Sequence, residues 1–257
     1  MPSDTGLNVT VWGDDEPAVL VHGSFGWGTE TWREQKPLAD SYRLLLVDRR
    51  GFGGSPANGR VDFERDAEDV ADLLGESAHL VGHSYGGVVA LLAAARRPAG
   101  VRSLAVIEPP ALGLVRGRPP VEEFIERIAN AVEEAADPPD YRMRFLHSFG
   151  FPAEREDFEG AALAAARSSW GERHPWEAEV PLDDLARAAF PKLVVRGAWD
   201  KVPPEAREWG GTIFASICDV LEERLAADSA LFTGAAHSPQ LLGKSFNERL
   251  RAFWESS

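Results

Sequence analysis

The most constraining feature of this chain is a serine between two glycines in "AHLVGHSYGGVVALLAAARR", residues 78–97. The apolar run before Gly82 predicts a buried strand, and the small-residue run after Tyr85 predicts a helix. Where a strand turns directly into a helix, bulky side chains at positions 82 and 86 would meet the neighbouring backbone. Gly82 and Gly86 remove that obstacle and leave the hydroxyl of Ser84 at the apex of the turn. The segment therefore predicts a sharp turn between a strand and a helix, with the hydroxyl of Ser84 exposed as a candidate nucleophile.

The rest of the chain alternates between short apolar runs and helical patterns. Runs such as "RLLLVD" and "SLAVIE" are nearly continuous in apolar residues, which is typical of strands buried on both faces of a parallel sheet. Helical patterns cover residues 29–38, 63–75, 85–97 and the C-terminal segment. This alternation predicts an α/β fold with a mostly parallel central sheet flanked by helices. The strands are expected at 7–12, 18–22, 43–48, 78–82, 101–107, 192–196 and 230–233.

One long segment breaks the alternation. Residues 109–190 contain helical runs such as "VEEFIERIANAVEEAA" and no convincing strand, and they are too long for a simple crossover between two strands. We expect them to form a helical cap over the carboxyl-terminal edge of the sheet. The α/β core is then formed by residues 1–108 and 191–257. The segment 205–227 is longer than a minimal connection and predicts no function.

Composition limits the partners and the compartment. The chain has 257 residues, with 27 Lys and Arg against 41 Asp and Glu, a net charge of −14. Nucleic acid and anionic membrane surfaces are disfavoured, because both require a basic face. No apolar run is long enough to span a bilayer, the N-terminus does not resemble a signal peptide, and there is a single cysteine, Cys218. We expect a cytoplasmic protein whose oligomeric state, homo-oligomers included, is left open.

Four further segments occur around the serine motif in a familiar order: "VLVHGSFGWGTETW", "LLLVDRRGFGGS", "PKLVVRGAWDKVPP" and "GAAHSPQ". Together with "GHSYG", they resemble the motifs of the α/β-hydrolase superfamily over nearly the full chain. The resemblance is to a capped, esterase- or lipase-like member with a serine nucleophile. It places the helical cap after the sixth strand of the family fold.

The resemblance also implies roles for particular residues. Ser84 would be the nucleophile, His237 the base that takes its proton, and Asp200 the acid that orients the imidazole. Glu108, which ends the preceding strand in "VIEPP", is the alternative acid. The backbone N–H groups of Ser24 and Tyr85 would form the oxyanion hole.

The sequence indicates neither a metal nor a cofactor. His79 and His83 share a face of one strand without an apparent third ligand, and no nucleotide-binding glycine motif is present. An apolar small-molecule substrate is expected instead. Aromatic residues that could line its pocket are Phe25, Trp27, Phe145, Phe149, Trp170, Trp176 and Trp199.

The predicted activity is that of a serine hydrolase of the carboxylesterase type. It would cleave a small apolar ester or lactone through an acyl-enzyme on Ser84, without a cofactor. Carbon–carbon bond hydrolases, thioesterases, cofactor-free perhydrolases and hydroxynitrile lyases use the same three residues, so they remain alternatives. A low-turnover small-molecule receptor on the same fold is a further alternative, because the fold alone does not determine the function.

Overall fold

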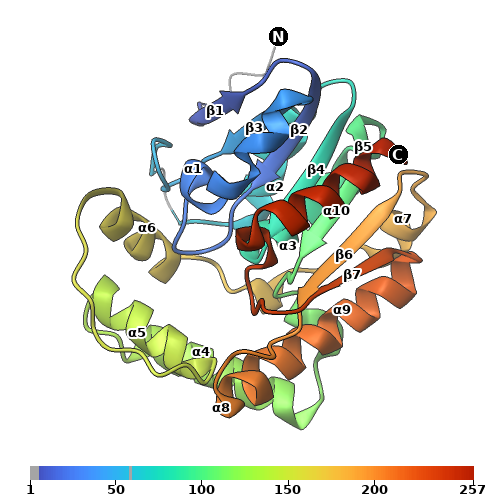
Figure 1. Cartoon of the computed structure of the whole chain (residues 1–257). Helices are drawn as coiled ribbons and strands as arrows, with labels where there is room; N and C mark the ends of the chain where they lie inside the picture. Colours follow the sequence, from blue (N-terminus) through green and yellow to red (C-terminus); the bar gives the residue numbers. More distant parts are fainter. Residues whose placement is uncertain (1–5, 58–59) are drawn as a thin grey trace.

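A computed structural model describes residues 6–57 and 60–257 of the chain. Its centre is a seven-stranded sheet in the order β1-β3-β2-β4-β5-β6-β7 (Figure 1). β1 runs antiparallel to β3, and every other neighbouring pair is parallel. The mostly parallel sheet expected from the sequence is therefore confirmed. The strands are β1 (Val9–Trp12), β2 (Glu16–Val21), β3 (Tyr42–Val47), β4 (Ala78–His83), β5 (Val101–Ile107), β6 (Lys192–Gly197) and β7 (Asp228–Phe232).

Helices bury both faces of the sheet. Along β2, Ala18 and Leu20 pack on one face while Val19 and Val21 pack on the other, as the two-residue period of a strand requires. The first face is covered by α1 (Gly28–Thr31), the 3₁₀ helix η1 (Arg33–Asp40) and α10 (Lys244–Glu255). The second face is covered by α2 (Phe63–Leu73), α3 (Tyr85–Arg96) and α9 (Thr212–Leu225).

The helix expected over residues 29–38 is divided. α1 ends at Thr31, and the chain continues from Arg33 as a 3₁₀ helix that contains Pro37. Proline has no backbone N–H and cannot donate the bond that would extend an α-helix through this position. Trp32, at the junction, is completely buried against the sheet.

The segment between β5 and β6, residues 109–190, is called the cap segment below. Among the described residues it contains helices and turns and no strand. Figure 1 shows α4, α5 and α6 grouped away from the sheet, whereas α7 packs against α3 and α9. The last helix of the segment therefore belongs to the layer that covers the sheet. The elements are η3 (Leu112–Val115), α4 (Pro119–Glu133), α5 (Pro138–Ser148), α6 (Gly160–Trp170), η4 (Pro175–Glu177) and α7 (Leu182–Arg187).

Most of the segment 205–227 is helical. α8 (Pro204–Ala206) is followed by the π-helical turn η5 (Arg207–Gly211), and α9 ends at Leu225. α9 buries Ile213, Phe214 and Ile217 against the second face of the sheet. Over the described residues, no helix is both long and apolar enough to cross a membrane.

Candidate active site

Ser84 occupies a strained turn between β4 and α3. Its backbone has φ 53° and ψ −126°, a conformation that non-glycine residues rarely adopt. A Cβ at Gly82 would lie 2.3 Å from the carbonyl oxygen of Gly86, and a Cβ at Gly86 would lie 2.4 Å from the carbonyl oxygens of Val21 and His22. Both glycines are therefore required by close backbone approach, as the sequence predicted.

His237 lies within hydrogen-bond distance of Ser84. His237 belongs to the loop that connects β7 to the 3₁₀ helix η6 (Pro239–Leu242). Its Nε2 is 2.8 Å from the Oγ of Ser84. The ring of Phe214 packs on the imidazole with centroids 4.3 Å apart. The Nε2 of His83 donates to the His237 carbonyl oxygen at 2.9 Å, which fixes the backbone of the loop. The expected pairing of Ser84 with His237 is present.

The carboxylate that contacts His237 belongs to Glu108. Its Oε2 lies 2.9 Å from the Nδ1 of His237. Its Oε1 accepts hydrogen bonds from the backbone N–H of Gly197 at 2.8 Å and from the indole N–H of Trp199 at 2.9 Å. Glu108 is completely buried, so these donors replace the water that a carboxylate would otherwise require.

The expectation that Asp200 orients His237 is wrong in this structure. Asp200 is exposed, and its Oδ1 accepts a hydrogen bond from the backbone N–H of Gly234 at 2.8 Å. Glu108 directly follows β5, the neighbour of β4, whereas Asp200 lies three residues beyond the end of β6. Trp199, the residue before Asp200, has a positive φ of 52° and directs its side chain to Glu108. The alternative acid considered from the sequence therefore occupies the position.

The backbone N–H groups of Ser24 and Tyr85 are available near the serine. Gly23 approaches Ser84 so closely that a Cβ on it would lie 2.7 Å from the Ser84 Cβ. No acceptor among the described residues takes a backbone hydrogen bond from Ser24 or Tyr85. Both residues also line the pocket that contains Ser84. The arrangement is compatible with the expected oxyanion hole.

The loop that carries Ser24 is held by buried polar contacts. The Nδ1 of His22 donates to the carbonyl oxygen of Gly23 at 2.6 Å, and its Nε2 accepts from the backbone N–H of Arg49 at 3.0 Å. Burial and the nearby Arg49 guanidinium lower the pKa of His22 well below its usual value, so the ring is neutral. This neutral form is the one that can accept from Arg49. His22 therefore braces the loop that carries Ser24.

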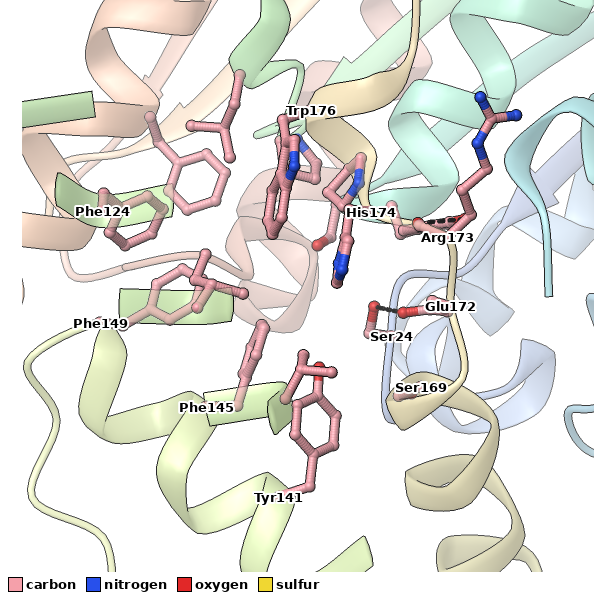
Figure 2. Close-up of a pocket in the computed structure, with 18 residues that line it drawn as sticks. Ser24, Phe124, Tyr141, Phe145, Phe149, Ser169, Glu172, Arg173, His174 and Trp176 are labelled. Carbon is pink, nitrogen blue, oxygen red and sulfur yellow. Dashed lines mark hydrogen bonds between the residues drawn. The ribbon is translucent and has the colours of Figure 1, made fainter. Parts of the chain in front are cut away.

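Ser84 lines a narrow, mostly apolar pocket between the sheet edge and the cap segment. Figure 2 shows Trp176 and His174 on one side of it, with Tyr141 and Phe145 on the opposite side. Of the predicted pocket residues, Phe145, Phe149 and Trp176 line this cavity. The lining residues are Ser24, Ser84, Tyr85, Pro110, Leu112, Phe124, Ile128, Val132, Tyr141, Phe145, Phe149, Ser169, Glu172, Arg173, His174, Pro175, Trp176 and Phe214.

Four predicted pocket residues lie elsewhere. Phe25 and Trp27 line a separate surface groove, although the Phe25 ring stacks on Tyr141 at 5.5 Å between centroids. The indole N–H of Trp170 donates to the carbonyl oxygen of Val132 at 2.9 Å, so this side chain packs within the cap segment. Trp199 is buried behind Glu108. Sequence position alone does not distinguish these supporting aromatics from those that face the cavity.

Several cavity residues were not expected from the sequence. Tyr141 is buried, its hydroxyl has no hydrogen-bond partner among the described residues, and Figure 2 shows it pointing into the cavity. His174 stacks on Trp176 with ring centroids 4.3 Å apart, and burial lowers its pKa. Glu172 lies beside Ser24. All three belong to the cap segment, whose path over the sheet edge has no local sequence signature.

The two histidines on β4 have separate partners. The Nδ1 of His79 lies 2.7 Å from the hydroxyl of Ser103, and His83 contacts the His237 loop. Within residues 6–57 and 60–257, no group of three or more His, Cys, Asp or Glu side chains could hold a metal ion.

The seven-stranded sheet, the strained serine turn and the Ser84–His237–Glu108 hydrogen bonds define the α/β-hydrolase class. Residues 18–250 match a family model described as the Alpha/beta hydrolase family, and the chain belongs to this family. The expected superfamily membership is therefore confirmed.

Curated relatives cover most of the chain. It is 29% identical over 254 residues to a pimeloyl-[acyl-carrier protein] methyl ester esterase from Aeromonas hydrophila, covering 91% of this chain and 92% of the relative. It is 31% identical over 237 residues to the enzyme with the same name from Sodalis glossinidius, covering 88% of each chain. Among solved structures, an esterase from Exiguobacterium antarcticum superposes with a TM-score of 0.68 at 22% identity, covering 97% of this chain and 95% of that one.

Proposed function

We propose that this protein is a serine hydrolase that cleaves carboxylic esters through an acyl-enzyme on Ser84. The observation that carries the proposal is the continuous set of hydrogen bonds from Ser84 through His237 to Glu108. Relatives at about 30% identity over most of the chain are named as esterases, which supports a carboxylic ester hydrolase. Those relatives are named pimeloyl-[acyl-carrier protein] methyl ester esterases.

The first half of the reaction forms the acyl-enzyme. His237 accepts the hydroxyl proton of Ser84 through Nε2 while Oγ attacks the ester carbonyl carbon. The carbonyl oxygen becomes an oxyanion that accepts hydrogen bonds from the N–H groups of Ser24 and Tyr85. The C–O bond to the alcohol then breaks, and His237 returns the proton to the departing alkoxide.

The second half releases the acid. Water loses a proton to Nε2 of His237 and attacks the acyl carbonyl carbon, and the bond to Ser84 Oγ breaks as the proton returns to that oxygen. Throughout, Glu108 accepts the Nδ1–H of His237, which leaves Nε2 as the basic nitrogen. It also stabilises the imidazolium that forms in each half.

The cavity lining favours a small apolar substrate. Phe124, Ile128, Phe149 and Phe214 form an apolar part of the cavity, while Ser24 and Glu172 lie at a more polar part. We expect esters or lactones with short apolar acyl groups to react best.

Labelling by an organophosphonate, together with turnover of a short-chain aryl ester, tests this function. We expect stoichiometric modification of Ser84 in the wild type and multiple turnovers. Ser84→Ala should abolish both labelling and turnover while leaving the melting temperature nearly unchanged, because the substitution removes one hydroxyl. Ester hydrolysis that persists in Ser84→Ala would refute the mechanism. Tight binding with one stalled turnover would instead indicate the receptor alternative.

A further inference from the structure

Both residues assigned to the oxyanion hole are tied by their side chains to consecutive residues of the cap segment. The hydroxyl of Ser24 donates to Oε2 of Glu172 (Figure 2), and the hydroxyl of Tyr85 donates to the carbonyl oxygen of Arg173 at 3.0 Å. The backbone N–H of Arg173 in turn donates to the carbonyl oxygen of Val61 at 2.8 Å, which docks this piece of the cap segment on the core. The path of the cap segment is therefore linked to the site of the oxyanion.

Glu172 also acts on the Ser24 loop from a second direction, through Arg49. The Nη2 of Arg49 donates to Oε1 of Glu172 at 2.6 Å and to the carbonyl oxygen of Gly23 at 3.1 Å. The Nε of the same guanidinium donates to the carbonyl oxygen of His22 at 3.0 Å. Glu172 and Arg49 together hold three consecutive residues of the loop.

The Gly23 contact determines where the Ser24 N–H points. The carbonyl of Gly23 and the N–H of Ser24 belong to one planar trans peptide unit, in which the two groups point in opposite directions. The Gly23 oxygen is held by Arg49 and by the Nδ1–H of His22. Rotating this peptide unit would therefore break both contacts, and it would also move the Ser24 hydroxyl that donates to Glu172.

We propose that Glu172 is a positioning residue, which fixes the Gly23–Ser24 peptide unit through Ser24 and Arg49 so that the Ser24 N–H faces the oxyanion. The proposal rests on the proposed function. It gives the cap segment a second task beside lining the cavity, because the oxyanion hole is complete only when residues 172 and 173 are docked on the core.

The surroundings of Glu172 allow this to be tested without unpairing a buried charge. The Arg49 side chain is completely buried, and it keeps a second carboxylate, Asp66, 3.0 Å from its Nη1. Glu172→Gln leaves a group of the same shape that can still accept from Arg49, whereas Glu172→Ala removes every contact. Ser24→Ala removes only the hydroxyl and leaves the contact between Glu172 and Arg49 in place.

The experiment measures kcat and KM for a short-chain aryl ester, together with the rate of inactivation by a small phosphonate. We expect Glu172→Ala to lower kcat by about 100-fold and Glu172→Gln by about 10-fold, with KM changed less than about twofold, because oxyanion contacts strengthen in the transition state. Phosphonate inactivation should slow in parallel. The double variant Ser24→Ala/Glu172→Gln should lower kcat by a factor much smaller than the product of the two single-variant factors, because both substitutions act through the same hydrogen bond.

Asp66→Asn is the matched control. It alters the other carboxylate on Arg49 without touching residues 22–24, so a loss of stability similar to that of Glu172→Gln should accompany a much smaller change in kcat. The inference is overturned if Glu172→Gln retains kcat within threefold, if its effect multiplies fully with that of Ser24→Ala, or if Asp66→Asn lowers kcat equally. Failure of the proposed function is distinguishable, because the wild type itself would then show no turnover that depends on Ser84.

Discussion

At the scale of single residues, the identity of the carboxylate that contacts His237 depends on which strand lies next to β4 in the sheet. Glu108 and Asp200 both follow strands that end at the same edge, and both could be read from the sequence as partners of His237. The structure assigns the contact to Glu108, whose second oxygen is held by the Gly197 N–H and the Trp199 indole. A carboxylate held on both oxygens has one orientation, and it therefore fixes the orientation of the imidazole.

This geometry predicts opposite outcomes for two isosteric substitutions. Glu108→Gln should lower kcat by about 10³–10⁴-fold, because an amide facing Nδ1 favours the wrong imidazole tautomer and cannot stabilise the imidazolium. Asp200→Asn should lower kcat no more than about twofold, because among the described residues the exposed Asp200 side chain accepts a hydrogen bond only from the backbone N–H of Gly234. Steady-state kinetics of the two variants would decide the matter. Inactive Asp200→Asn beside active Glu108→Gln would show that the acid is Asp200.

The residues of the site differ in how far the sequence determines them. Ser84 and His237 are predictable, because glycine spacing and a loop before the last helix mark them locally. The choice between Glu108 and Asp200 is not, since it depends on whether the Trp199 side chain turns toward β5. Glu172 and Tyr141 carry no local signal at all. They reach the cavity only through the tertiary path of the cap segment.

At the scale of elements, the strands and long helices follow the hydrophobic pattern closely. The strands β2 to β6 are buried on both faces, and such runs cannot be placed on the surface. The cap segment is predictable as helical but not in its packing. α5 and α6 lie away from the sheet, so amphipathic patterns do not reveal which face meets the cavity and which meets another cap helix.

Two tryptophans of the cap segment should therefore respond differently to truncation. Trp176 lines the cavity, so Trp176→Ala should enlarge it and raise the preference for longer over shorter acyl chains by about 10-fold in kcat/KM. Trp170 donates to Val132 and stacks on Tyr141, so Trp170→Ala should lower the free energy of unfolding by about 2 kcal/mol. It should change chain-length preference much less.

A series of aryl esters and urea denaturation would measure both effects. If Trp170→Ala changed the chain-length preference as much as Trp176→Ala, the assignment of different roles to the two tryptophans would be contradicted. Equal losses of stability without any change in preference would contradict the placement of Trp176 in the cavity.

At the scale of the whole molecule, three histidines are buried in the neutral form. Burial lowers the pKa of His22 well below its usual value, that of His79 to about 4 and that of His83 to about 3. They lie on β4 and in the loop after β2, at the centre of the sheet. Above about pH 7.5, a histidine of the unfolded chain is almost entirely neutral as well, so the three groups hardly affect stability there.

The sign of the effect on acidification follows from proton binding. Between pH 6.5 and about 4 the unfolded chain binds protons that the folded histidines do not, so the free energy of unfolding falls as pH falls. For each histidine the loss between pH 7.5 and 5.5 is about 1.4 kcal/mol, or about 4 kcal/mol for the three. Burial also raises the pKa of Asp66 and Glu172, although Arg49 opposes this, and their protonation in the fold would offset part of the loss.

Replacing one of the three histidines isolates its contribution to the pH dependence of stability. His79 packs against the rings of Tyr42 and Trp254, and its Nε2 lies 3.5 Å from Oε2 of Glu16. It lies near the start of β4, whereas Ser84 follows the end of this strand, so His79→Leu removes a titrating group without altering the proposed active site. Urea denaturation at pH 7.5 and 5.5 should show a loss of stability in His79→Leu that is about 1.4 kcal/mol smaller than in the wild type. The two buried carboxyls are present in both proteins, so they cancel in this difference. An equal pH dependence in the two proteins would mean that His79 takes up its proton in the folded state, and the neutral burial of this ring would then be refuted.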